Sequence, residues 1–90
     1  MSTYKQRADI FYSEIPDHIK EDLCDSILWA KNFLTHHEGG GHDFQISTNA
    51  NGEFCCSFAK PEWSGDHSGR YMLTVPEAIV MSVCEYLSGV

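Results

Sequence analysis

The segment THHEGGGHDF, residues 35–44, contains the side chains best suited to chemistry: three histidines and a glutamate around three glycines. His37, Glu38 and His42 come close to the zinc-protease pattern, in which two histidines one helical turn apart hold the metal and a glutamate acts as base. Here the second histidine stands one residue too late. Three consecutive glycines also oppose the helix that would align the ligands. The spacing therefore excludes a zinc-protease site.

A looser zinc site would need four nitrogen, sulfur or oxygen ligands in tetrahedral geometry. The weak candidate ligands are His36, His37, His42 and His67, with Asp66 beside the last. Neither Cys-x-x-Cys nor His-x-x-x-His fixes their spacing, and ordering a glycine-rich tether around a metal is entropically costly. The favoured interpretation is a helix end, where histidines suit the negative end of the helix dipole, followed by a loose joint. We expect no metal and no cofactor.

The four cysteines do not form a catalytic pattern; they are Cys24, Cys55, Cys56 and Cys84. Successive strand residues point to opposite faces, so we expect Cys56 in the core and Cys55 on the outer face of a sheet. A cysteine nucleophile needs a histidine base, and no local motif supplies one. We therefore expect buried free thiols in a reducing compartment, no catalytic residues, and a protein that is not an enzyme.

Acidic residues form the second notable group. Asp17, Glu21 and Asp25 follow one another at intervals of four, with Asp22 beside them and Lys20 as the nearby cation. Like charges at this spacing destabilise a helix by about 0.2–0.5 kcal/mol per pair. Two interpretations stay open: a solvated helix face, or a face that binds a basic partner. With 13 acidic against 6 basic residues and a net charge of −7, we expect no direct binding to nucleic acid.

The loop KPEWSGDHSGR carries Trp63 among glycine, serine and charged residues. Tryptophan is enriched at interaction hot spots, but a loop tryptophan equally serves to cover its own core. Both interpretations stay open. The candidate partner-binding residues are therefore Asp17, Glu21, Asp22, Asp25 and Trp63.

The elements that must position these residues follow from hydrophobic periodicity. Apolar residues recur at steps of three or four over 16–37 and over 75–88, which predicts two helices. Thr74 and Glu77 form a capping box at the start of the second. Apolar and polar residues alternate over 42–48 and return over 53–59 after the turn signal Asn51-Gly52, and 70–74 predicts a short third strand.

The order helix, hairpin, strand, helix predicts a two-layer α+β domain, with an antiparallel sheet of about three strands between the two helices in sequence. Residues 1–90 are enough for a single domain. Residues 1–12 fit either a short helix or an extended arm, and that choice stays open.

The sequence shows neither a membrane-spanning segment nor a signal peptide. No apolar run approaches the roughly 20 residues that span a bilayer. The start, MSTYKQRADIFYSEIPD, lacks the continuous apolar middle of a signal peptide. We therefore expect a cytoplasmic protein without a membrane partner.

A family resemblance covers mainly residues 42–88. It lies in a strand with Phe44 and Ile46, an Asn-Gly turn, an aromatic strand, and the helix TVPEAIVMSVCEYL, opened by Thr-x-Pro-x-Ala-Ile. In these features the chain resembles the small phage-encoded proteins grouped as ABA-sandwich domains. The resemblance implies an origin in a phage or prophage, hence the host cell cytoplasm, and a small accessory role. It implies no catalytic residue.

Charge, size and this resemblance together lead us to expect a protein that binds a host protein with a basic surface. Inhibitors of nucleic-acid-handling defence factors, such as those of CRISPR effectors, commonly have this small, acidic, single-domain character. An alternative is a homodimer formed through Leu28, Trp29 and Phe33, because small domains often gain core by pairing. A zinc- or thiol-dependent enzyme is the least favoured class.

Overall fold

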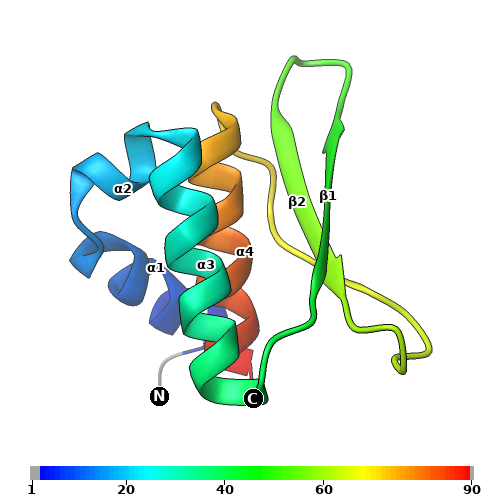
Figure 1. The fold of residues 1–90 in the computed structure, drawn as a ribbon. Helices are drawn as coiled ribbons and strands as arrows, with labels where there is room; N and C mark the ends of the chain where they lie inside the picture. The colour runs from blue at the N-terminus through cyan, green and yellow to red at the C-terminus, as the bar shows by residue number, and fades with distance from the viewer. Residues whose placement is uncertain (1–2, 90) are drawn as a thin grey trace.

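One three-stranded antiparallel sheet and four helices make up residues 3–89, the part of the chain that this computed structural model describes (Figure 1). In chain order the elements are α1 (Tyr4–Glu14), α2 (Asp17–Glu21), α3 (Leu23–Glu38), β1 (Asp43–Thr48), β2 (Phe54–Ala59), β3 (His67–Ser68) and α4 (Val75–Gly89). The predicted α+β class, with its antiparallel sheet and its N-terminal and C-terminal helices, is confirmed.

The region left open in the sequence, residues 1–12, contributes helix α1. Thr3 begins it with a capping box: its Oγ1 accepts from the backbone N–H of Gln6 at 3.2 Å, and Gln6 Oε1 accepts from the Thr3 N–H at 2.7 Å. Ala8 is fully buried on its inner face. Residues 1 and 2 of the predicted arm lie outside the described residues.

The prediction of a single helix over 16–37 is wrong, because the helix is interrupted at Asp22 and forms two helices, α2 and α3. Asp22 has an extended backbone, with φ −119° and ψ 129°, and its carboxylate accepts from the backbone N–H of Asp25 at 2.9 Å. Aspartate is among the best residues for starting a helix. Asp22 therefore starts a new helix, α3, at a position where hydrophobic periodicity alone predicts that the first helix continues. The predicted stop is confirmed, since Gly39 ends α3 with φ 84°.

The predicted hairpin is confirmed within one residue at each boundary. β1 and β2 pair antiparallel, with Phe44 opposite Phe58 and Ile46 opposite Cys56. Gly52 adopts φ 76° in the turn, a conformation that suits glycine.

The third strand does not lie at 70–74 as predicted. The strand that pairs with β2 is His67–Ser68, and in the predicted range Met72 forms an isolated bridge to Phe54. Arg70 leaves the ladder because its backbone N–H donates to Glu85 Oε1 on α4, at 2.7 Å. A buried carboxylate thus takes the place of a strand partner.

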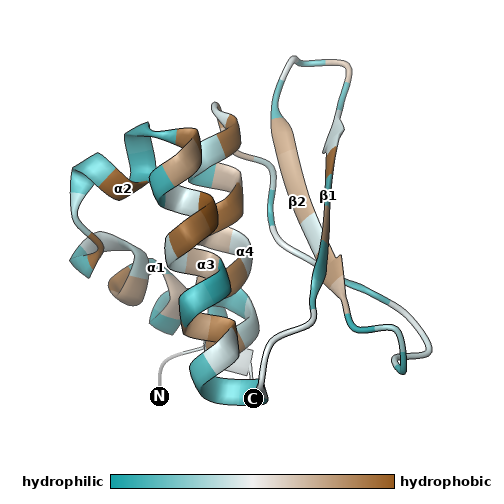
Figure 2. Ribbon diagram, in the orientation of Figure 1, coloured by the Kyte–Doolittle hydropathy of each residue, from teal (hydrophilic) through white to brown (hydrophobic). Residues whose placement is uncertain are grey.

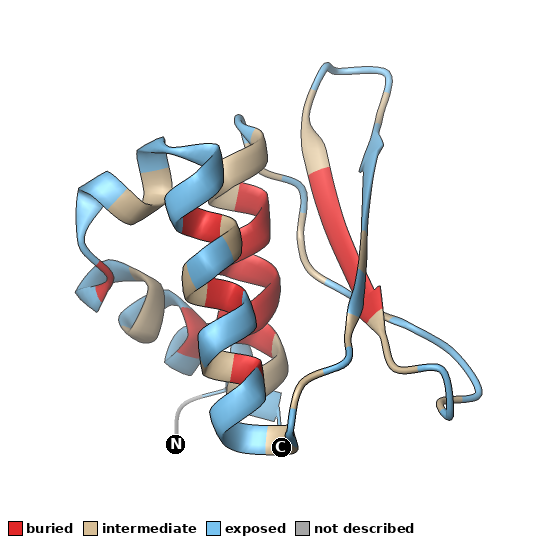
Figure 3. Ribbon diagram, viewed as in Figure 1, coloured by how far each residue is buried: buried red, intermediate tan, exposed pale blue. Residues whose placement is uncertain are grey.

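Helix α4 is the centre of the molecule, and its residues from Ala78 to Glu85 are buried without interruption (Figure 3). It packs against α1, α2, α3 and β2, with β3 at its side. In Figure 1, α1 and α2 lie on the side of α4 away from the sheet. The helices next to the sheet are therefore backed by further helices, beyond the two that were predicted. Figure 2 shows the hydrophobic residues concentrated on α4 and β2, whereas α2 is mostly hydrophilic.

Of the helices in residues 3–89, none combines the length and the hydropathy of a membrane span.

Candidate functional site

The predicted acidic residues lie on the surface at the corner between α2 and α3. Asp17 and Glu21 belong to α2, Asp22 caps α3, and Asp25 stands in the first turn of α3; all four are exposed. We call these four residues the acidic corner. The sequence predicted one continuous acidic helix face, but the helix is interrupted at Asp22, so the four residues do not share one.

Lys20, the only lysine or arginine in residues 17–25, does little to neutralise the acidic corner. Its ammonium lies 3.6 Å from a carboxylate oxygen of Asp17, whose side chain is largely exposed. It also donates to the backbone oxygen of Tyr12 at 3.2 Å and lies 4.5 Å from the centre of that ring. Lys20 is therefore held against α1, and the other carboxylates face solvent.

An apolar groove of about 490 Å³ lies beside the acidic corner, between α3 and β1. Its volume is within the usual range of ligand sites. Leu23 and Ile46 stand at its mouth, 48% and 43% exposed. The lining residues are Leu23, Ile27, Lys31, His42, Asp43, Phe44, Ile46, Val75 and Ile79.

The groove exists because α4, and not α3, covers the sheet. β2 packs directly on α4, while α3 packs on α2 and α4. In Figure 1 the hairpin lies to one side of the helices, apart from α3. The apolar side chains that β1 and α3 turn toward each other are thus left to line the groove.

β1 is also an open edge of the sheet. In the described chain it pairs with β2 and with no strand on its other side. The backbone N–H of Asn49 donates to the oxygen of Glu53, and hydrogen-bonded pairs alternate with non-bonded pairs along an antiparallel ladder. The backbone groups of Phe44, Ile46 and Thr48 therefore point away from β2, to the open edge.

Bonds on the far side of β2 agree with this alternation. Thr48 stands opposite Phe54 in the register. Phe54 exchanges both backbone hydrogen bonds with Met72 instead, at 2.7 Å each. It follows that Thr48 has its backbone N–H and oxygen turned outward.

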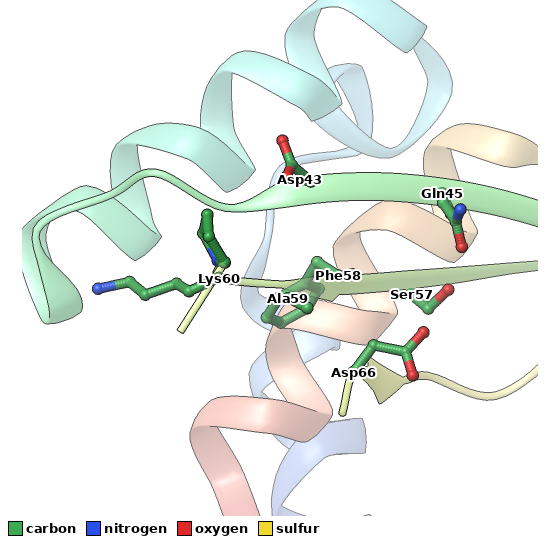
Figure 4. Close-up of a pocket in the computed structure, with 8 residues that line it drawn as sticks. Asp43, Gln45, Ser57, Phe58, Ala59, Lys60 and Asp66 are labelled. Carbon is green, nitrogen blue, oxygen red and sulfur yellow. The ribbon is translucent and has the colours of Figure 1, made fainter. Parts of the chain in front are cut away.

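A second, smaller pocket of about 230 Å³ lies on the opposite face of the sheet, between the hairpin and the loop that follows β2. Figure 4 shows the carboxylate of Asp66 pointing toward Ser57 and Gln45, while Asp43 points away. Lys60 also lines this pocket, but its ammonium donates to the backbone oxygen of Glu38. The pocket therefore presents a carboxylate without a cation beside it.

Trp63 lies over its own core. Its ring centre is 5.6 Å from that of His42, 5.7 Å from that of Tyr86 and 6.3 Å from that of Phe58. The side chain is half-buried. Trp63 thus covers the rings of His42, Phe58 and Tyr86. Only the exposed part of its side chain is available to a partner.

The four histidines considered as zinc ligands do not converge on one point. His36 and His37 are exposed on the last turn of α3, and the ring of His37 stacks on Phe33. His42 Nε2 lies 2.9 Å from Glu38 Oε2, and His67 Nε2 donates to the backbone oxygen of Ser82 at 3.1 Å. Within residues 3–89, no three histidine, cysteine or acidic side chains are grouped to hold a metal.

The segment between α3 and β1, expected to be a loose joint, is held in place by Glu38. Its Oε1 accepts a hydrogen bond from the Tyr86 hydroxyl, and its Oε2 pairs with His42. Burial alone would raise the pKa of Glu38, but the bonds to Tyr86 and His42 and the charges nearby lower it. Burial and the Glu38 carboxylate raise the pKa of Tyr86 to about 12. At neutral pH Glu38 is thus ionised and Tyr86 protonated, each serving to hold the other.

A second polar cluster joins α1 to α4. Arg70 places Nη1 2.7 Å from Asp9 Oδ1 on α1, and its Nε is 3.5 Å from Oε1 of the buried Glu85. Sequence reasoning missed the Arg70–Asp9 pair and the bond from Tyr86 to Glu38, because the two partners of each lie tens of residues apart in the chain. No spacing rule connects them.

The thiols differ from the sequence expectation at two positions. Cys24 is exposed and not buried. Cys55 lies on the face opposite Cys56 as expected, but it is not exposed there: its exposure is 6%, and its Sγ donates to the backbone oxygen of Gly69 at 3.0 Å. Burial raises the pKa of Cys55, that of Cys56 to about 11 and that of Cys84 to about 12. These three thiols are protonated at neutral pH and are poor nucleophiles.

The helix surface proposed for a homodimer is partly covered by Phe11 of α1, and Trp29 and Phe33 are half-buried. The ring centre of Phe11 lies 5.5 Å from that of Phe33 and 6.3 Å from that of Trp29. Leu28 is the member of the predicted set that stays exposed, at 59%. Part of the apolar surface seen in the sequence therefore packs against the first helix of the same chain.

Comparison with protein-family models, curated protein sequences and solved structures gives no match to this chain. The resemblance to phage ABA-sandwich proteins therefore stays a prediction, as does the phage or prophage origin that it implies.

Proposed function

We propose that this chain is a binding protein that docks its acidic corner on a basic surface of a partner protein. The observation that carries the proposal is the set of exposed carboxylates within residues 17–25, where the only lysine is held against Tyr12. Exposed like charges repel one another and weakly destabilise the free protein. A basic partner would relieve that repulsion.

The chemistry of such a partner follows from the charge. With a net charge of −7, the chain attracts basic proteins over long range and speeds their encounter with it. Lysine and arginine clusters on proteins often serve to hold nucleic-acid phosphates. We therefore propose a nucleic-acid-handling partner, whose phosphate-binding surface the acidic corner would occupy. An inhibitor of a host defence factor, such as a CRISPR effector, is the class that fits this description.

A binding role is favoured over catalysis by the state of the chemically capable groups. The raised pKa values of Cys55, Cys56 and Cys84 disfavour thiolates. Glu38 and Tyr86, the strongest acid-base pair by geometry, are bonded to each other and lie between packed helices. Their arrangement supports a structural role.

The test is affinity capture from host lysate with a charge-reversed variant and a matched control. The variant is Glu21→Lys with Asp25→Lys, which spares Asp17 and its contact with Lys20. The control, Glu62→Lys with Asp66→Lys, changes the net charge equally at exposed positions outside the acidic corner. Captured proteins are identified by mass spectrometry, and each is then assayed for competition by added nucleic acid.

We expect wild type and control to capture the same basic protein, the variant to lose it, and nucleic acid to displace it. Capture that rises with salt, or that is lost equally in the variant and the control, would contradict a local acidic docking face. A captured protein without a basic surface would contradict the proposed partner class.

A further inference from the structure

We infer that the open edge of β1 and the groove beside it form a site for an extended, basic segment of a partner protein, bound as an added strand. The outward backbone groups of Phe44, Ile46 and Thr48 supply the hydrogen bonds for such a strand. The inference rests on the proposed function, because it names the shape of the segment that a basic partner would offer.

The groove lies where the side chains of an added strand would fall. A new strand would lie about 4.8 Å from β1, with alternate side chains on each face of the sheet. Phe44 and Ile46 line the groove from β1. Side chains of the added strand that point to the same face of the sheet would therefore enter the groove between β1 and α3. Leu23 and Ile27 line that space from α3, which favours apolar residues at these alternating positions.

The edge of β1 lacks the usual protection against pairing. Sheets commonly guard an edge with lysine, proline or a bulge, or cover it with another element. The sequence of β1, DFQIST, contains none of these residues and has its only charge at Asp43, the first position. Its pairing with β2 runs without a bulge from Asp43 to Thr48. The strand is thus regular and open along its whole length.

Charge decides between a foreign segment and a second copy of the chain. Asp43 lines the groove, and Leu23 at its mouth has Asp22 as its neighbour in sequence, with Asp25 two residues on. Lys31 is the one lysine or arginine in the lining. Two copies would bring together two chains of net charge −7. A segment with apolar residues at alternate positions and lysine or arginine at its ends fits the surface better.

The first experiment uses synthetic peptides as probes for the full chain. The test peptide alternates valine and threonine and has lysines at both ends; one control replaces the lysines by glutamates, and another has a central proline. Binding is followed by NMR, with amide hydrogen exchange of each backbone N–H. We expect the lysine peptide to slow exchange at Phe44, Ile46 and Thr48, and both controls to leave it unchanged.

Variants of the protein test the edge and the groove separately. Thr48→Pro removes an N–H that points outward and leaves the bonds to β2 in place, since proline is tolerated on edge strands. Ile46→Thr keeps a β-branched side chain but reduces the apolar surface of the groove. We expect each to weaken binding of the lysine peptide about tenfold, a change of ~1.4 kcal/mol. Gln45→Thr, on the opposite face, should bind like wild type. Circular dichroism serves to check that all three fold.

Three results would overturn the inference: amides of Phe44, Ile46 and Thr48 that stay unprotected at saturating peptide, equal binding of the glutamate peptide, or a dimer of the free chain that already protects these amides. Its failure is distinguishable from failure of the proposed function. Loss of a basic partner by Glu21→Lys with Asp25→Lys, but not by Thr48→Pro, would keep the acidic docking face and refute the added strand.

Discussion

The hydroxyl group of Tyr86 on α4 donates a hydrogen bond to Oε1 of Glu38, the last residue of α3. The other oxygen of that carboxylate pairs with His42, just before β1, and the backbone oxygen of Glu38 accepts from Lys60, just after β2. One residue thus joins both central helices to both strands of the hairpin. This junction sets the position of α3 relative to β1, and with it the groove.

Removing the Tyr86 hydroxyl should weaken this junction. Tyr86→Phe keeps the ring contacts with Phe58 and Trp63 but leaves Oε1 of Glu38 without its donor. Because a hydrogen bond to a charged group contributes about 1.5–3 kcal/mol, we expect a loss of that order in the free energy of unfolding, measured with urea. Tyr71→Phe, at an exposed site, is the control. Equal stability of the two variants would show that the bond to Glu38 contributes nothing.

The stability of the fold should decrease as the pH falls through the range where His67 titrates. Burial lowers the pKa of His67 below its ordinary value of 6.5, although Ser82, Glu85 and Asp66 partly oppose that shift. The unfolded chain therefore binds more protons near pH 6, so the free energy of unfolding rises with pH there. The stabilisation is present above pH 6.5 and is lost as the pH falls through the folded pKa.

Urea unfolding of the wild type and of His67→Gln, between pH 7.5 and 5, tests this sign. The glutamine keeps a donor for the Ser82 oxygen but does not titrate. We expect the variant to have the flatter profile. A wild type that becomes more stable on acidification in this range would mean that His67 is protonated more easily in the folded state.

Gly69 should tolerate no side chain, for reasons of space. A Cβ atom built there would lie 2.6 Å from Ser82 Cα and 2.8 Å from Ser82 Cβ, both on the central helix. Because α4 cannot shift without disturbing the core, we expect Gly69→Ala to destabilise the fold by about 1–3 kcal/mol. Gly65→Ala is the matched control, since nothing lies within 4 Å of its Cβ position. Similar melting temperatures for the two variants would refute the close approach.

Local signals were sufficient to predict much of the fold. The alternation around Phe44 and Ile46 and the Asn51-Gly52 turn each act within a few residues, and the structure contains both. Of the predicted Thr74-Glu77 box it contains one half: Thr74 Oγ1 accepts from the N–H of Glu77 at 3.4 Å, while the Glu77 carboxylate accepts from the Thr74 hydroxyl at 2.7 Å. The capping box of Thr3 and Gln6 is equally local and would have identified α1. Such features depend on neighbours in sequence, so they are readable before the fold is known.

The third strand and the groove, which sequence reasoning did not predict, depend on residues far apart in the chain. The third strand starts earlier than predicted because Gly69 must pass α4 and Arg70 must reach Glu85. The groove arises because α4 covers β2 while α3 leaves β1 open. Neither relation leaves a periodic signal. The lack of lysine and proline in residues 43–48 was the one hint that the sequence contained.

Thiol labelling should distinguish Cys24 from the other three cysteines. Cys24 is exposed on α3, whereas Cys55, Cys56 and Cys84 are buried. Reactivity requires both access and the thiolate form, and burial raises the pKa of all three buried thiols. We therefore expect one thiol to react quickly with a disulfide reagent in native buffer and the rest only on unfolding. Cys24→Ser should abolish the fast phase, and a fast phase that persists in this variant would show that a core thiol is accessible.

Asp22 belongs to the acidic corner and also caps α3, and two substitutions separate these roles. Its carboxylate accepts from the N–H of Asp25 at 2.9 Å, a bond that asparagine can also form. We expect Asp22→Ala to lower the free energy of unfolding by about 1 kcal/mol, and Asp22→Asn by only a few tenths, from the lost charge at the helix N-terminus. Binding to a basic partner should weaken in both variants, because both remove the charge. If Asp22→Asn binds like wild type while Asp22→Ala does not, Asp22 acts in binding through the helix that it caps, and the docking face reduces to Asp17, Glu21 and Asp25.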